Sequence, residues 1–124
     1  KIKEISYVHA EAFAAGELKH GSIALIDKGT PVVAIATQGK LFEKMVSNMQ
    51  EVRARGARVI AITQEGNTEV EKSADRVIYI PKVDDMFASI TAVVPMQLLA
   101  YHASNIRGLD VDKPRNRAKS ETVE

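Results

Sequence analysis

Three short apolar runs, each about as long as one β-strand, constrain the fold of this chain more than any other feature. They are rich in β-branched residues and lie at 31–37, 58–63 and 76–80. Short, continuously apolar runs are typical of strands buried on both faces of a parallel sheet. An amphipathic pattern over 41–55 and a short polar one over 68–73 separate them, and both indicate helices. This alternation predicts an α/β fold, a three-layer sandwich with a mostly parallel sheet and right-handed connections.

The first sixteen residues carry a helical pattern of their own. Its apolar positions, three or four residues apart, form one expected buried face: Ile2, Ile5, Val8, Ala12 and Phe13. Lys1 and Glu4 lie around the other side, and Gly16 is expected to end the helix because glycine tolerates a left-handed backbone. The segment 16–21, GELKHG, then holds an acid, a base and an imidazole. An ordinary helix–loop junction does not need so many proton-transfer groups, so this segment is a candidate functional site.

The longest predicted helix runs from Asp84 to about Arg107. Asp84 or Asp85 is expected to cap it and Gly108 to stop it. Because the segment is apolar almost all round, we expect it to be buried on several sides or to lie in a subunit interface. Pro95 lies inside the segment and predicts a kink or a division into two helices.

Length and composition limit the classes of protein that this chain can belong to. It has 124 residues, 45% of them hydrophobic, which is enough for one domain with a core. A formal net charge of +1 gives no strong attraction to nucleic acid or to a membrane, and no apolar run has the length of a membrane span. The absence of cysteine excludes disulfides, thiolate catalysis and Cys-ligated zinc, and it suits a cytoplasmic protein.

Two observations predict a fragment of a longer polypeptide. Three strands are few for a sheet of this kind, so we expect an incomplete sheet of three or more strands. The chain also begins with Lys1 inside a helical pattern, which favours a cut at its amino end.

Two blocks, EISYVHAEAFAAGELKHG at 4–21 and DVDKPRNRAKSETVE at 110–124, are specific enough to carry a family resemblance. Together with VRARGARV at 52–59 and VPMQLLAYH at 94–102, they closely resemble the carboxy-terminal part of the glutamine–fructose-6-phosphate aminotransferases (isomerising). The wider family is that of the sugar isomerase (SIS) domains, and the resemblance covers essentially the whole chain. It implies a flavodoxin-like sandwich in which residues 1–109 are the latter part of a second SIS domain. Residues 110–124 would then be an irregular tail that carries an active-site lysine.

In that family an amino-terminal glutaminase domain releases ammonia, and two SIS subdomains with a tail form the fructose 6-phosphate site. The resemblance implies that this chain belongs to the isomerase region, which binds a phosphosugar and moves a proton between C1 and C2 on the way to glucosamine 6-phosphate. It implies a homodimer, a glutaminase domain in the parent chain and no cofactor. We expect the chain alone to be inactive, because the phosphate-binding loop and the ammonia source are missing.

The isomerisation needs a base that serves both carbons, a group that opens the sugar ring, and a cation for the developing oxyanion. By resemblance, Glu4 matches the proton-shuttling glutamate and His20 matches the ring-opening histidine, which the neighbouring subunit supplies. An imidazole with a pKa near 6.5 can both accept and donate a proton at cytoplasmic pH. Lys119 matches the tail lysine that reaches the carbonyl end of the substrate, Ala118 would contribute backbone contacts to the sugar, and Lys1 matches another lysine of the site. Without the resemblance, a helical glutamate or a tail lysine would be interpreted as a solvated surface residue.

Other polar residues have plainer interpretations. His9 and His102 lie in segments rich in apolar residues, where a histidine that packs is favoured over a ligand. No two histidines have metal-site spacing with a supporting carboxylate, so we expect no metal. The cations that alternate along 113–119 lack interleaved aromatics and are flanked by acids, which argues against nucleic acid. The segment 63–67, TQEGN, is either a ligand loop at the sheet edge or a surface turn.

Three further points concern the loop around His20 and the tail. Glu17 either orients His20 or serves the helix end. Ser22 stands where many members of the family carry Pro, which is expected to loosen this loop, and Arg117 stands where Leu is expected.

Rival functions remain for a chain with this pattern. A phosphosugar-binding SIS module that regulates without catalysis would normally join a helix-turn-helix domain, of which the sequence has no trace, and would not need the AKSETVE ending. A stand-alone phosphosugar isomerase does not fit the truncated start. A receiver or flavodoxin-like domain shares the alternation, but no acidic cluster or Gly-rich phosphate loop follows the strands.

Overall fold

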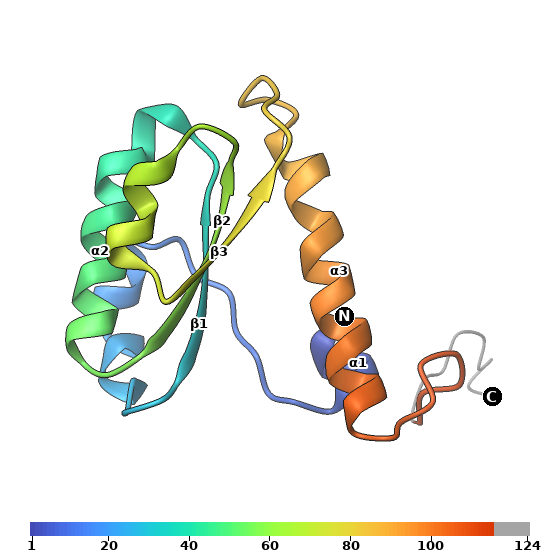
Figure 1. Ribbon diagram of the computed structural model, residues 1–124. Helices are drawn as coiled ribbons and strands as arrows, with labels where there is room; N and C mark the ends of the chain where they lie inside the picture. Colours follow the sequence, from blue (N-terminus) through green and yellow to red (C-terminus); the bar gives the residue numbers. More distant parts are fainter. Residues whose placement is uncertain (116–124) are drawn as a thin grey trace, which may run out of the picture. The chain divides into compact units, whose positions relative to one another are not determined.

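The computed structural model describes residues 1–115 of the chain (Figure 1). The chain forms two compact units, of which one is the continuous segment 12–93. The other combines residues 1–11 with the residues from Val94 onward. Ala118 and Lys119, two of the residues that the resemblance singles out, lie outside the described residues.

A parallel sheet forms the centre of the continuous unit. Its strands are β1 (Pro31–Ala36), β2 (Arg58–Gln64) and β3 (Arg76–Ile80), and they lie in the order β1-β2-β3 with both pairs parallel. In the register, Val32 of β1 faces Val59 of β2. In residues 1–115 the sheet has three strands, so the predicted α/β fold with a parallel sheet is confirmed.

Two helical connections cover one face of this sheet (Figure 1). A short 3₁₀ turn, η3 (Gly39–Leu41), leads into α2 (Phe42–Ala54), which joins β1 to β2, and η4 (Thr68–Ser73) joins β2 to β3. The core between the sheet and these helices consists mainly of small and β-branched side chains: Ala34, Ala36, Met49, Val52, Ala57, Val59, Ala61, Val70 and Ala74. Small side chains on the strands let the helices approach closely, which is how one layer of a small α/β unit reaches interior packing density.

A glycine follows the end of α2. Gly56 has φ 94°, and a Cβ atom placed on it would lie 2.9 Å from the Cα of Lys28. The Gly56 carbonyl accepts a 2.7 Å hydrogen bond from the Gly29 amide. Only glycine allows both this left-handed backbone and the close approach of the segment before β1.

The longest helix, α3 (Ala88–Ile106), is continuous through Pro95, so the predicted division into two helices is wrong. It begins later than predicted, and neither aspartate caps it. The Asp84 carboxylate accepts the Met86 amide at 2.9 Å, and the Asp85 carboxylate accepts the Gly39 amide at 3.0 Å.

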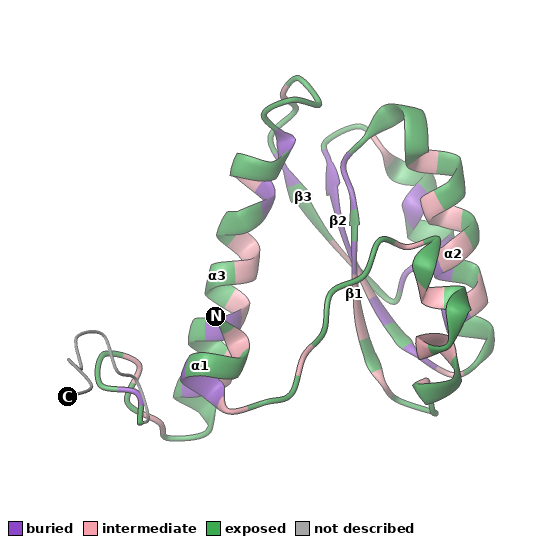
Figure 2. Cartoon of the chain, turned by 180° about the vertical axis from the view of Figure 1, so that it is seen from behind, coloured by how far each residue is buried: buried purple, intermediate pink, exposed green. Residues whose placement is uncertain are grey.

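Much of the apolar surface of α3 is exposed, so the prediction of burial on several sides is wrong for this chain by itself (Figure 2). The exposed apolar residues recur at helical spacing and end with Ile106, which is 85% exposed: Ile90, Val93, Val94, Leu98, Tyr101 and Ile106. An apolar helix face of this length is typical of a surface that another part of a protein covers. In residues 1–115, no helix combines the length and the hydropathy that a membrane span needs.

The helix predicted over the first sixteen residues ends after its first turn and a half. α1 covers only Ile2–Ser6, and Tyr7 follows it with a left-handed backbone, φ 55° and ψ 26°. Val8 and Phe13, which were expected on the buried face, are exposed. The physical reason why α1 is short involves a residue far away in the sequence. The Ile5 carbonyl accepts a hydrogen bond from the Ser104 hydroxyl, and not from a backbone amide that would continue the helix.

Candidate functional site

Glu4 and Lys1 lie together at the start of the chain. Glu4 is in the first turn of α1, and its Oε2 atom lies 3.4 Å from the Nζ atom of Lys1. Both side chains are more than half exposed, so solvent screens this ion pair strongly. A carboxylate in this setting is accessible to a small molecule.

The opposite side of α1 is anchored. Ile5 and Ser6 are buried, and the Ser6 hydroxyl donates to the Ile2 carbonyl at 2.7 Å. The hydroxyl of Ser104, which is completely buried, donates to the Ile5 carbonyl at the same distance. Glu4 therefore projects from a short helix whose position the end of α3 fixes.

Tyr7 links α1 to the beginning of the tail. Its hydroxyl oxygen accepts a 2.7 Å hydrogen bond from the Arg115 amide, and the Arg115 guanidinium carbon lies 4.1 Å from the centre of the Tyr7 ring. The segment before Arg115 is itself ordered as a turn, because the Asp110 carboxylate accepts the amides of Asp112 and Lys113. The last described residues are therefore held on the helix that carries Glu4.

Helical spacing did not predict this role of Tyr7. Inside a helix, Tyr7 would only have lain beside Glu4 on a polar face, and its left-handed backbone is not visible in the helical spacing. A hint was available, since Tyr7 and Arg115 fall in the two end blocks, EISYVHAEAFAAGELKHG and DVDKPRNRAKSETVE. Two distinctive blocks at opposite ends of a sequence are candidates for a mutual contact.

His20 belongs to the other unit, the one with the sheet. It is the last residue of the 3₁₀ helix η1 (Glu17–His20) and is exposed. Gly21, with φ 137°, makes the sharp turn into the next 3₁₀ helix, η2 (Ser22–Leu25). Lys19 ties η1 to α2, because its Nζ atom lies 2.6 Å from the Glu51 carboxylate.

Among the described residues, those singled out by resemblance thus fall into two groups, one in each unit. Lys1 and Glu4 are neighbours on α1, and Arg115 brings the beginning of the tail to the same helix. His20 stands on the continuous unit. In residues 1–115, no hydrogen bond joins Glu17 to His20.

The other two histidines, His9 and His102, lie on the surface. His9 is not in a helix, and its side chain is 80% exposed and lies 3.6 Å from the Glu11 carboxylate, so the expectation of a packing histidine is wrong. His102 is also exposed and meets Tyr101 edge to face. Among the described residues, no three His, Asp or Glu side chains form a group that could hold a metal ion.

At the carboxyl edge of the sheet, the polar side chains that end β2 form hydrogen bonds with backbone groups of the chain itself. Buried Gln64 donates to the Thr37 carbonyl at 3.0 Å and accepts the Val83 amide at 2.8 Å. Thr63 is also buried, and its hydroxyl donates to the Ala36 carbonyl. Because these side chains are used internally, the segment 63–67 fits a surface turn better than a ligand loop.

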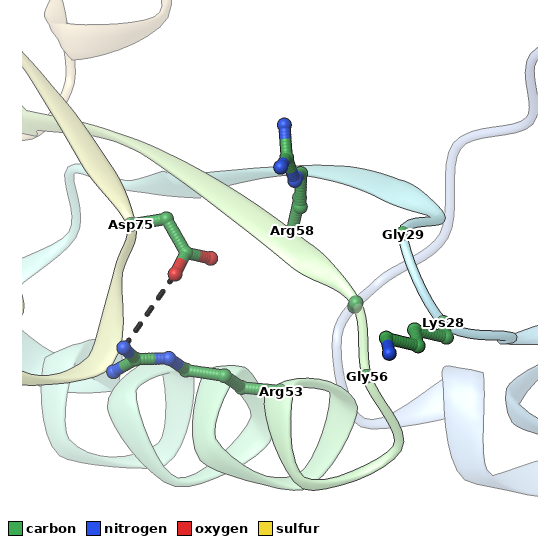
Figure 3. A pocket seen from close by; sticks show the side chains of 7 residues that line it. Lys28, Gly29, Arg53, Gly56, Arg58 and Asp75 are labelled. Carbon is green, nitrogen blue, oxygen red and sulfur yellow. Dashed lines mark ion pairs between the residues drawn. The ribbon is translucent and has the colours of Figure 1, made fainter.

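A hollow of about 650 Å³ lies at the opposite, amino edge of the sheet (Figure 3). Arg53 and Asp75 form an ion pair of 3.5 Å across it, and Arg53 also donates to the Lys72 carbonyl. The second oxygen of Asp75 accepts the Val59 amide at 2.7 Å. These bonds close the base of the sheet. Lys1, Glu4 and His20 are not among the described residues that line the hollow: Lys28, Gly29, Arg53, Gly56, Ala57, Arg58 and Asp75.

Known proteins resemble this chain along its whole length. The family model described as "SIS domain" matches residues 1–107. Glutamine–fructose-6-phosphate aminotransferases (isomerising) from Thermus thermophilus and Methanosarcina acetivorans are 60% and 58% identical to it over 124 residues. This alignment covers 100% of the chain but 20% of each relative, so the chain spans about a fifth of their length.

A solved structure also matches. It is the C-terminal domain of glucosamine-fructose-6-phosphate aminotransferase from Francisella tularensis, which is 41% identical to this chain and superposes with a TM-score of 0.80. The match covers 90% of this chain and 32% of that one. Sequence and fold therefore point to the same group of proteins.

Proposed function

The chain belongs to the SIS domain family, and we propose that it is part of the isomerase region of a glutamine–fructose-6-phosphate aminotransferase. In this function it binds fructose 6-phosphate, whose C2 carbonyl condenses with ammonia and releases water, and it then moves a proton from C1 to C2 of the resulting imine to give glucosamine 6-phosphate. The observation that carries the proposal is the 60% identity to such an enzyme over all 124 residues. Residues 1–109 then form the latter part of a SIS domain and 110–124 its tail.

Each proposed site residue has a separate task. Glu4 carries the proton between C1 and C2, and its exposure on a fixed helix suits a base that must reach both carbons. His20 opens the sugar ring, because an imidazole can give a proton to the ring oxygen and take one from a hydroxyl. Lys119 stabilises the charge that develops on the carbonyl oxygen, while Ala118 and Lys1 contact the sugar.

The proposed partners follow from the same relatives. The parent chain carries a glutaminase domain that supplies ammonia, and two parent chains form a cytoplasmic homodimer in which His20 serves the neighbouring site. The exposed apolar residues of α3 support the presence of a covering protein surface. No cofactor takes part, and the 124 residues by themselves are inactive, because they span only about a fifth of the length of the relatives named as aminotransferases.

A chimeric enzyme tests this function directly. In the Thermus thermophilus relative, this chain replaces the 124 residues that it matches, and formation of glucosamine 6-phosphate from fructose 6-phosphate and glutamine is measured. We expect turnover, and we expect Glu4→Gln to abolish it while fructose 6-phosphate still binds. A folded chimera that binds the sugar without turning it over would instead favour a regulatory SIS module.

A further inference from the structure

We propose that the hollow at the amino edge of the sheet binds the phosphate group of a small molecule, through the side chains of Lys28 and Arg58. The block VRARGARV at 52–59 forms part of its wall, and the proposed isomerase function gives this block no task. The described residues that line the hollow all belong to the continuous unit, residues 12–93, and phosphate binding there does not depend on the isomerase function.

The charges that line the hollow are unbalanced. The described residues of its lining include one acid, Asp75, and three cations: Lys28, Arg53 and Arg58. The acid is already paired, because it lies 3.5 Å from Arg53 and also accepts the Val59 amide at 2.7 Å. The chain as a whole is nearly neutral, with 17 basic and 16 acidic residues, so this excess of positive charge is local. Such an excess raises the local concentration of anions.

Two of the three cations are available to a ligand. Lys28 and Arg58 are exposed, and among residues 1–115 neither side chain forms a hydrogen bond or an ion pair. Arg53, in contrast, is held by Asp75 and by the Lys72 carbonyl, to which it donates at 2.9 Å. Figure 3 shows Arg58 pointing away from this ion pair. An anion can therefore reach Lys28 and Arg58 without displacing a carboxylate.

The backbone segments that carry these two side chains are fixed next to each other. The Gly29 amide donates to the Gly56 carbonyl at 2.7 Å, and the Arg58 amide donates to the Thr30 carbonyl at 2.8 Å. A Cβ atom placed on Gly56 would lie 2.9 Å from the Cα of Lys28, so the two segments are in close contact. Lys28 and Arg58 thus project from one frame, while their long side chains keep the freedom to close on a ligand.

Size and side-chain chemistry indicate the kind of anion. The planar guanidinium group of Arg58 can bind two oxygens of a phosphate at once, and the Lys28 ammonium adds a mobile point charge. The hollow has a volume of about 650 Å³, within the range of roughly 300–1,000 Å³ that is usual for small-molecule sites. Gly29 leaves this space open, because a Cβ atom there would have no neighbour within 4 Å among the described residues. A phosphate carried by an organic group or by a second phosphate fits better than a small monovalent ion.

Inorganic pyrophosphate is the probe, and isothermal titration calorimetry of the full-length chimera measures its binding. Saturating fructose 6-phosphate occupies the proposed sugar site, and divalent cations are left out. We expect Arg58→Gln and Lys28→Gln each to weaken binding about 5- to 10-fold, through loss of a charge-assisted hydrogen bond. Asp75→Asn should strengthen binding about 3- to 10-fold, since it removes a negative charge and releases Arg53, while the amide oxygen can still accept the Val59 amide.

Arg55→Gln is the matched control. Arg55 belongs to the same block, but its guanidinium group donates to the Glu51 carbonyl at 2.8 Å, and it is not among the described residues that line the hollow. We expect its affinity for pyrophosphate to equal that of the unmutated chimera. Malonate, whose two carboxylates offer less charge and fewer oxygens, should bind at least about 5-fold more weakly than pyrophosphate. Absence of pyrophosphate binding, equal weakening in Arg55→Gln or equal binding of malonate would overturn the inference.

The two proposals fail differently. An unmutated chimera that folds but produces no glucosamine 6-phosphate would count against the proposed function. The calorimetry needs no turnover, so it still judges the phosphate site in that case. Weaker binding in Arg58→Gln together with stronger binding in Asp75→Asn supports the site, and unchanged affinity in both variants overturns it.

Discussion

The buried hydroxyl of Ser104 donates a 2.7 Å hydrogen bond to the carbonyl of Ile5, ninety-nine positions earlier in the sequence. This one bond satisfies a carbonyl at the end of α1 and holds the helix against the end of α3. The Ser104 carbonyl in turn accepts the amides of Arg107 and Leu109, which close the carboxyl end of α3. Ser104 is thus the point at which the first helix and the last helix meet.

Ser104→Ala should therefore destabilise the chain. The substitution leaves the Ile5 carbonyl without its donor in a buried place, so we expect a loss of about 1–3 kcal/mol in the free energy of unfolding. Urea unfolding followed by circular dichroism measures it. Ser47→Ala, at an exposed position of α2, should stay within about 0.5 kcal/mol of the unmutated chain. Equal stabilities of the two variants would contradict the role given to Ser104.

Two glycines with the same backbone angle allow steric and conformational costs to be separated. Gly56 and Gly66 both have φ 94°, but only Gly56 has a neighbour that a Cβ atom would meet, the Cα of Lys28 at 2.9 Å. Gly66→Ala should cost about 1–2 kcal/mol, the strain of a left-handed alanine. Gly56→Ala should cost about 1–3 kcal/mol more, because the backbone before β1 must move. Thermal unfolding of both variants tests the difference, and similar melting temperatures would refute it.

Mixed dimers test whether His20 serves the neighbouring subunit. Chimeras carrying Glu4→Ala and His20→Ala are each expected to be inactive. In a heterodimer purified with two different tags, one site receives both substitutions and the other receives neither, so about half of the normal activity should return. Recovery would not occur if His20 acted in the site of its own subunit. Heterodimers in which both chains carry His20→Ala provide the baseline.

Tyr79 provides a prediction about pH. Its hydroxyl donates to the Glu71 carboxylate at 2.5 Å, and this hydrogen bond, together with desolvation and the negative charge of Glu71, raises the pKa of Tyr79 above its usual value. Because the neutral tyrosine is the favoured form, the contribution of this pair to stability is present below the usual pKa of tyrosine and is lost as pH rises through the raised one. Titration of the phenolate absorbance of Tyr79 should move to lower pH in Glu71→Gln. Glu69→Gln, on the same 3₁₀ helix, should leave the titration of Tyr79 unchanged.

The sheet unit could be predicted from the sequence because local pattern and burial agree there. The runs that become β1, β2 and β3 are apolar over the length of one strand, and each is followed by a turn or a helical segment. The end of α2 was predictable for a similar reason, since Gly56 follows the amphipathic pattern over 41–55 directly and a glycine in this place is typical of a helix end. At these positions, the residues next to one another in the sequence are enough to predict the secondary structure.

The first helix could not be predicted in the same way. Helical spacing from Ile2 to Phe13 indicates one long helix, yet the helix ends at Ser6 because the side chain of Ser104 takes the carbonyl of Ile5. The pairing of Tyr7 with Arg115 is equally distant in sequence. Family resemblance identified Glu4 and His20 as candidates, but it did not predict the contacts that Tyr7 makes with Arg115.

The unit that holds Glu4 is built from the two ends of this sequence, with the sheet unit inserted between them. During synthesis on a ribosome, α1 emerges well before Ser104, whose hydroxyl donates to the Ile5 carbonyl, has been added. By then the segment 12–93, whose strands pair with their immediate neighbours in the sequence, can already have folded. The contacts that α3 makes with the helix of Glu4 therefore form only after the segment that contains the sheet has been synthesised.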